Sequence, residues 1–221
     1  MGFTNSPLVS YKRISPHKTV NRNHAIDTIT IHCIVGQLTA KQGCDYFATT
    51  DRDCSSNYVV GKDGSIGLSV EEKDRSWCSS SRENDHRAIT IEVASDKTSP
   101  YKVTDAAYKA LIELLVDICQ RNNIPELKWK ADKNLIGQVD KQNMTVHRWF
   151  ANKSCPGDYL YNLHGQIADE VNARLKKASA NKQDVLYRVQ VGSYSIKSNA
   201  ESMMQKLKKA GYDAIIVEAK K

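Results

Sequence analysis

Residues 28–35 read TITIHCIV, a stretch that is rich in β-branched residues. Such a stretch is typical of a β-strand, in which successive side chains point to opposite faces. One face carries the apolar side chains Ile29, Ile31 and Cys33. His32 points to the other face together with Thr30, so the sequence predicts a buried strand that holds His32 away from the apolar core.

A second stretch, residues 88–94, repeats this pattern as AITIEVA. Its apolar face consists of Ile89, Ile91 and Val93. Glu92 points the opposite way, so we expect Glu92 and His32 both to lie away from the core. Between the two stretches, NYVV and SIGL flank the turn GKDG at residues 61–64, which predicts a β-hairpin.

The later part of this region has the periodicity of helices. Apolar residues recur every three or four positions from Ala107 to Ile118, and Thr104 is placed to cap that helix. A second apolar stripe runs from Leu160 to Leu175. The sequence therefore predicts an α/β domain over residues 1–177, with a central mixed β-sheet flanked by helices.

The composition changes after this domain. Residues 178–184 are small and polar, which favours a linker. Beyond it, LYRVQVGSY and DAIIVEA have strand character, and NAESMMQKLKKAG between them is an amphipathic helix that ends at Gly211. We therefore predict a small βαβ unit over residues 185–221.

Composition and charge narrow the classes of partner. The 221 residues are 40% hydrophobic and 26% charged, as in a globular protein with an apolar core. The net charge of +7 favours a polyanion, but no nucleic-acid-binding signature accompanies it, so no nucleic-acid partner is expected. The first twenty residues lack the apolar run of a signal peptide, and no stretch reaches membrane-spanning length. We expect synthesis in the host cytoplasm and no insertion into a membrane.

The six cysteines contain no CxxC pair, so most are expected to be reduced. Cys33 and Cys119 lie on apolar stretches and are predicted to be small core residues. Cys44 and Cys54 flank a short segment and are candidates for pairing under oxidising conditions.

Three residues have the chemistry of zinc ligands: His32, His147 and Cys155, the last two lying in VHRWFANKSCPG. A catalytic zinc ion takes three protein ligands and one open position. Nitrogen and thiolate ligands are too soft for Ca²⁺ or Mg²⁺, so this set favours Zn²⁺. A strand histidine taken alone is more often a hydrogen-bonded structural residue, and that alternative remains open for His32.

Four separated motifs carry a family resemblance: ITIHCIVG, SSNYVVGKDGSI, SWCSSSRENDHRAITIEVAS and TVHRWFANKSCPGDYL. In order and chemistry they resemble the type-2 N-acetylmuramoyl-L-alanine amidases, a superfamily that includes phage amidase lysozymes and animal peptidoglycan-recognition proteins. The resemblance covers residues 25–177. It implies cleavage of the amide between N-acetylmuramic acid and the L-alanine of the peptidoglycan stem peptide, with Zn²⁺ as cofactor.

The resemblance also implies roles for individual residues. His32, His147 and Cys155 match the zinc ligands, Lys153 matches a residue that stabilises the transition state, and Glu92 matches the carboxylate that acts on water. One position departs from the family: a catalytic tyrosine found in one branch aligns here with Ser56, and its role is not transferred to Tyr58. The alternatives are that Glu92 pairs with an arginine such as Arg87, and that Lys153 is a solvated loop lysine.

The sequence also suggests residues that contact the substrate and a biological role. Trp77, His86 and Trp149 lie close to motif residues and are candidates for lining a groove that binds peptidoglycan. The resemblance favours a phage endolysin that acts on the cell wall. The alternatives are a host autolysin of the same activity and a non-catalytic peptidoglycan-recognition protein.

The C-terminal unit resembles the first half of a sporulation-related repeat, a domain that binds glycan strands. A lone βαβ unit leaves a sheet edge and an apolar helix face exposed. We therefore predict a homodimer through residues 185–221. The alternative is that this unit packs against its own amidase domain.

Overall fold

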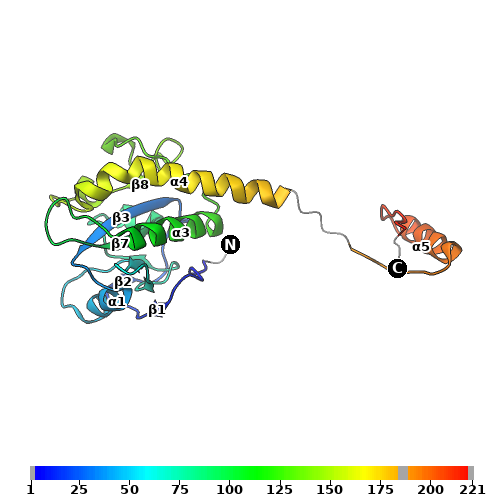
Figure 1. The fold of residues 1–221 in the computed structure, drawn as a ribbon, viewed down its shortest axis with the longest axis horizontal. Helices are drawn as coiled ribbons and strands as arrows, with labels where there is room; N and C mark the ends of the chain where they lie inside the picture. The colour runs from blue at the N-terminus through cyan, green and yellow to red at the C-terminus, as the bar shows by residue number, and fades with distance from the viewer. Residues whose placement is uncertain (1–2, 184–188, 219–221) are drawn as a thin grey trace. The chain divides into compact units, whose positions relative to one another are not determined.

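The computed structural model describes residues 3–183 and 189–218, which form two units, residues 1–180 and 181–221. The first unit is built around one sheet (Figure 1). Within the described part of the chain, no helix is both long and apolar enough to cross a lipid bilayer.

The sheet of the first unit has six strands in the order β1-β5-β4-β7-β3-β8. Their bounds are β1 Tyr11–Lys12, β3 Thr28–Val35, β4 Tyr58–Val60, β5 Ile66–Leu68, β7 Ala88–Ser95 and β8 Met144–Thr145. β3 lies between β7 and β8 and is parallel to both. β4 and β5 form the predicted antiparallel hairpin, so the sheet is mixed as expected. A small antiparallel pair, β2 Lys18–Thr19 and β6 Arg75–Ser76, lies outside it.

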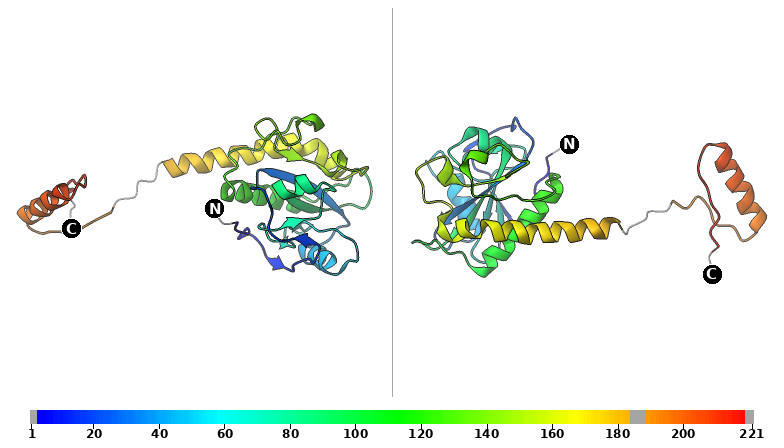
Figure 2. Two further views of the ribbon diagram at one scale, coloured as in Figure 1. Left: turned by 180° about the vertical axis from the view of Figure 1, so that it is seen from behind. Right: turned by 90° about the horizontal axis from the view of Figure 1, so that it is seen from above.

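One face of the sheet forms the main core. Two helices pack there against Ile29 and Ile31 of β3 and Ile89 and Ile91 of β7. They are α3 Asp105–Arg121 and α4 Gly157–Gln183, which run along the sheet (Figures 1 and 2). Thr104 caps α3 as predicted, since its side chain accepts a hydrogen bond from the Ala107 N–H. The apolar stripes read from the sequence are therefore the buried faces of these helices.

The opposite face of the sheet is more polar and faces α1 Ala40–Thr49 and α2 Arg82–Arg87. Asn84 of α2 bonds to Thr30 of β3 at 3.0 Å and to Thr145 of β8 at 2.9 Å, and the two threonine hydroxyls are 2.7 Å apart. A buried, fully paired network of this kind fixes the relative positions of its elements. It therefore holds α2 and β8 against β3, next to His32. Two 3-10 turns complete the unit, η1 Lys133–Leu135 and η2 His147–Trp149.

The chain from residue 178 onward differs from the expectation in two respects. The linker was predicted over residues 178–184, but helix α4 continues as far as Gln183, and residue 184 lies outside the described residues. The predicted helix of the second unit is present as α5 Lys197–Lys209, and Gly211 follows it with φ +87°. The two strands were predicted over residues 186–194 and 213–219. Their described parts, residues 189–194 and 213–218, form no strand, and their other residues lie outside the described chain (Figure 2).

The missing strands have a physical explanation. A strand is stabilised by hydrogen bonds to a neighbouring strand, and a sheet of two strands is marginal in water. The apolar side chains of these segments are largely exposed, as in Val189 at 90% and Ile215 at 81%. Periodicity predicted which residues have strand character, but a sheet partner is needed for the strands to form.

Candidate metal centre

The parallel register of the sheet brings His32 and His147 together. Thr30 of β3 pairs with Thr145 of β8, and each histidine follows its threonine by two residues. The two imidazole rings consequently lie with centroids 5.3 Å apart. Cys155, in the loop before α4, places its Sγ 3.3 Å from His32 Nδ1.

These three side chains have the geometry of a metal site. One ligand atom from each of His32, His147 and Cys155 lies within 4.8 Å of the other two. Tetrahedral zinc, with bonds of about 2.1 Å to nitrogen and about 2.3 Å to sulfur, places neighbouring ligand atoms about 3.4–3.8 Å apart. The distance from His32 Nδ1 to Cys155 Sγ is close to that value, so the residues fit a zinc ion.

The protonation of the two histidines also suits a metal. Burial lowers the pKa of His32 well below its usual value, with a smaller contribution from His147. Burial and the positive charge of Lys153 lower the pKa of His147. Both imidazoles are therefore neutral at physiological pH, which is the form that coordinates metals.

Neighbouring residues position the other two side chains. Ser80 Oγ lies 2.9 Å from His147 Nε2, which leaves Nδ1 of that ring available. The Arg148 guanidinium donates to the Ser154 carbonyl at 2.6 Å, and the Arg148 backbone N–H donates to the Cys155 carbonyl at 3.1 Å. The loop that carries Cys155 is thus held next to η2 by hydrogen bonds.

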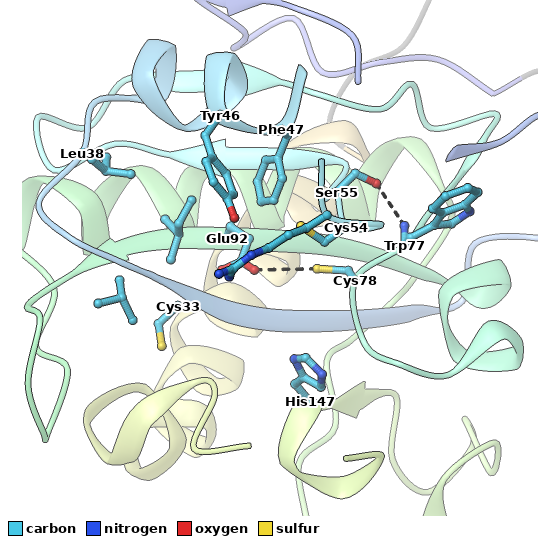
Figure 3. Close-up of a pocket in the computed structure, with 13 residues that line it drawn as sticks. Cys33, Leu38, Tyr46, Phe47, Cys54, Ser55, Trp77, Cys78, Glu92 and His147 are labelled. Carbon is cyan, nitrogen blue, oxygen red and sulfur yellow. Dashed lines mark hydrogen bonds between the residues drawn. The ribbon is translucent and has the colours of Figure 1, made fainter. Parts of the chain in front are cut away.

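A pocket of about 420 Å³ adjoins His147 (Figure 3). It is lined by Cys33, Ile34, Val35, Leu38, Tyr46, Phe47, Arg52, Cys54, Ser55, Trp77, Cys78, Glu92 and His147.

Glu92 lies on the floor of this pocket, directly opposite His32 in the register of β3 and β7. Cys78 Sγ donates to Glu92 Oε1 at 3.8 Å, whereas the buried Oε2 has no hydrogen-bond partner among the described residues. Burial, together with the nearby Cys33 thiol, raises the pKa of Glu92 to about 8. Arg87 pairs instead with Asp27, at 2.6 and 3.0 Å, so the alternative of a Glu92–Arg87 pair is excluded.

The other candidate residues differ in whether they line the pocket. Trp77 lines the pocket, and its indole N–H donates to Thr19. Lys153 is exposed at the edge of the site, close enough for its charge to act on His147. His86 and Trp149 do not line the pocket. His86 of α2 accepts a hydrogen bond from the Asn23 backbone N–H, and Trp149 is 8% exposed.

Trp149 stacks on Trp129 with ring centroids 5.0 Å apart and planes 5° apart. This contact buries one face of the ring, which explains why a tryptophan beside the metal motif does not reach the groove. Tyr58, to which no catalytic role was transferred, donates to Glu72 in the core at 2.6 Å and does not line the pocket.

Several pocket residues were not found by sequence reasoning. Cys33, predicted to be a core residue, is half-buried and forms a thiol hydrogen bond with Cys155 that raises the pKa of Cys155. Tyr46 and Cys54 come from α1 and the loop after it. Cys44 and Cys54 are free thiols in the structure.

The raised pKa of Glu92 leads to a prediction for the metal-free protein. A carboxyl whose pKa rises from 4.5 to about 8 on folding stabilises the fold below pH 4.5, and this contribution is lost as pH rises toward 8. The quantity to compare is the free energy of unfolding of Glu92→Gln minus that of the wild type. At about 1.4 kcal/mol per pKa unit, this difference should shift in favour of the variant by about 3–4 kcal/mol between pH 5 and pH 8. Urea unfolding at both pH values measures this. The exposed control Glu113→Gln should show no such change, and an equal response of both variants would contradict the prediction.

Comparisons with known proteins find two family profiles that match parts of this chain. The profile of the N-acetylmuramoyl-L-alanine amidase family matches residues 22–158, and the profile of the SPOR domain matches residues 165–219, beginning inside α4. No curated protein matches the chain.

Among solved structures, a selenomethionine derivative of AmpD is similar with a TM-score of 0.55 and 19% identity, over 76% of this chain and 99% of AmpD. PlyL gives a TM-score of 0.49 and 18% identity, over 73% and 95% of the two chains. The amidase LysC from Clostridium intestinale URNW gives 0.47 and 14%, over 77% and 99%. The AmpD similarity confirms the predicted fold class, and because the amidase profile covers more than half of the 221 residues, the chain belongs to the N-acetylmuramoyl-L-alanine amidase family.

Proposed function

We propose that this protein is a zinc-dependent peptidoglycan hydrolase that cleaves the amide between N-acetylmuramic acid and L-alanine. Family membership supports amidase activity on peptidoglycan. The observation that carries the finer proposal is the convergence of His32, His147 and Cys155 within 4.8 Å, beside a pocket that contains Glu92.

His32, His147 and Cys155 would hold the metal, which when bound polarises the scissile carbonyl and lowers the pKa of water toward about 7. Glu92 is the group in the pocket suited to accept a proton from water and return it to the departing amine. Positive charge at the three-ligand site favours the carboxylate form that accepts the proton. The pKa of about 8 in the metal-free protein would be lowered by that positive charge, which suits both halves of this transfer.

Lys153 supplies a positive charge at the edge of the site. This charge contributes, after burial, to lowering the pKa of the neighbouring His147. We propose that Lys153 stabilises the negative charge that develops on the carbonyl oxygen during attack.

The test of the reaction is to digest purified cell wall and identify the new chemical groups. The proposal predicts free L-alanine amino termini without new reducing sugars. It also predicts that a chelator abolishes lysis and that Zn²⁺ restores it. New reducing ends would instead indicate a glycosidase, and lysis unaffected by a chelator would contradict the metal requirement.

Replacing Lys153 by methionine tests the charge at this position. Because Lys153 is exposed and therefore screened by solvent, we expect a loss in kcat at the low end for such donors, about 10²-fold, with little change in KM. Initial rates on purified wall measure it. Lys62→Met, which removes another exposed lysine, is the matched control. A rate within twofold of that control would show that Lys153 is only a solvated lysine.

The biological role we propose is that of a phage endolysin acting on the cell wall, with a host autolysin as the alternative. This proposal rests on the resemblance of residues 147–160 to endolysin sequences. Release of progeny phage that depends on this chain would support it.

For the second unit we propose binding to glycan strands and pairing of two chains. The SPOR match supports a peptidoglycan partner. Pairing is motivated by the exposed apolar residues on both sides of α5, among them Val189, Ile215 and Val217 at 90%, 81% and 61%. Light scattering at micromolar concentration should give twice the monomer mass of 24.8 kDa. Ile215→Lys should shift the mass toward the monomer, and a monomeric wild type would contradict the pairing.

A further inference from the structure

A second group of metal-ligating side chains adjoins the three-ligand site. One ligand atom from each of His32, Cys78 and Glu92 lies within 4.8 Å of the other two. Figure 3 shows Cys78 and Glu92 facing each other in the pocket, with His147 nearby. His32 is the residue that this group shares with the first set.

Two atoms of this group have no partner. Glu92 Oε2 and His32 Nε2 are both buried and make no hydrogen bond to any described residue. A buried polar atom without a partner costs about 1–3 kcal/mol, so such atoms usually mark the position of an unseen ligand or water. His32 Nδ1 faces Cys155 of the first set. The other ring nitrogen, Nε2, is therefore the atom that His32 can offer to the second group.

The third member, Cys78, is held in place by its surroundings. The carboxylate of Asp85, a buried residue of α2, accepts the backbone N–H of Cys78 at 2.9 Å and that of Ser79 at 3.2 Å. These contacts fix the loop between β6 and α2 next to Glu92. Outer contacts of this kind orient the ligands of metal sites.

We propose that Cys78, Glu92 and His32 form a second cation site, which takes a thiophilic divalent ion such as Zn²⁺ or Cd²⁺ beside the first. Filling this site once the first is occupied would release two protons to solvent, one from the Cys78 thiol and one from the His32 ring, which would then bridge the two ions as an imidazolate. A thiolate, a carboxylate and an imidazole together select such an ion over Ca²⁺ or Mg²⁺. The adjoining pocket of about 420 Å³ provides room for water to complete the coordination.

The site has a regulatory consequence, which rests on the proposed function. An ion bound to Glu92 occupies the carboxylate that would accept the proton from water. Excess Zn²⁺ should therefore inhibit wall lysis, while a single equivalent supports it.

The first test measures binding without reference to activity. Metal-free full-length protein is titrated with Cd²⁺, and bound ion is counted by equilibrium dialysis while thiolate-to-Cd²⁺ charge-transfer absorbance is followed. We expect two equivalents for the wild type. Cys78→Ser should keep the tighter equivalent and weaken the other by more than about a hundredfold, since even an outer contact of a metal site is worth 10–100-fold.

Matched variants make the result specific. Cys54→Ser removes another thiol of the same pocket that is outside the proposed set, and it should still bind two equivalents. The tighter equivalent retained by Cys78→Ser also shows that this variant is folded. A single equivalent in the wild type, or two unchanged equivalents in Cys78→Ser, would overturn the proposal.

The second test measures the ratio of wall lysis at excess Zn²⁺ to lysis at one equivalent. We expect this ratio to be about 0.1 or less in the wild type and to be close to one in Cys78→Ser. If two equivalents bind but the protein has no amidase activity, the proposed function fails and the second site stands. If the protein lyses the wall but binds only one equivalent at every metal concentration, the proposal of a second site is wrong and the proposed function stands.

Discussion

Replacing Cys155 by alanine is expected to lower wall lysis by more than about 10³-fold and to remove the tighter equivalent of bound zinc. The thiol is the only sulfur in the set with His32 and His147, and its Sγ lies 3.3 Å from His32 Nδ1. Two imidazoles alone hold the ion less tightly, and without the ion no water of lowered pKa is available as nucleophile. Metal content by elemental analysis and initial rates on purified wall measure the two effects.

The matched control is Cys119→Ala, which removes a fully buried thiol from α3 in the main core. It should cost some stability but retain both zinc and lysis. Thermal unfolding of the two variants separates loss of fold from loss of the site. A Cys155→Ala variant that is folded and lyses the wall at the rate of the control would exclude Cys155 as a metal ligand.

Replacing Glu92 by glutamine is expected to reduce kcat by about 10²–10⁴-fold, the usual range for loss of a general acid–base group. Glutamine keeps the size of the side chain but cannot accept and return a proton. Since Glu92 is outside the set of His32, His147 and Cys155, the tighter zinc equivalent should remain. The measurements are kcat on purified wall and zinc content of the same preparation.

Glu113→Gln, at an exposed position of α3, is the control for this change and should be as active as the wild type. Near-normal lysis by Glu92→Gln with zinc retained would remove Glu92 from the mechanism. Loss of both lysis and the tighter zinc equivalent would instead indicate that Glu92 holds the first ion.

The sequence determined the local elements of this protein. Alternation along residues 28–35 and 88–94 placed His32 and Glu92 on the polar side of their strands, and the structure has them there in register. The helical stripes and the N-cap Thr104 were also correct, because each depends on residues a few positions apart. Family motifs then indicated which polar residues belong together.

Tertiary structure decided which of these residues meet. The parallel pairing of β8 with β3 sets His147 beside His32, and no local pattern shows that two strands more than a hundred residues apart are neighbours. The same applies to Cys78, which reaches Glu92 because Asp85 and the Asn84 network hold α2 against the sheet.

The differences between expectation and structure have the same origin. Trp149 stacks on Trp129 instead of lining the pocket, a contact between distant parts of the chain. Residues 189–194 and 213–218 have the composition of strands, yet a strand forms only when another strand satisfies its backbone hydrogen bonds. Short-range periodicity is written in the sequence, whereas the site depends on strand order and loop packing, which arise only when distant segments bury their surfaces together.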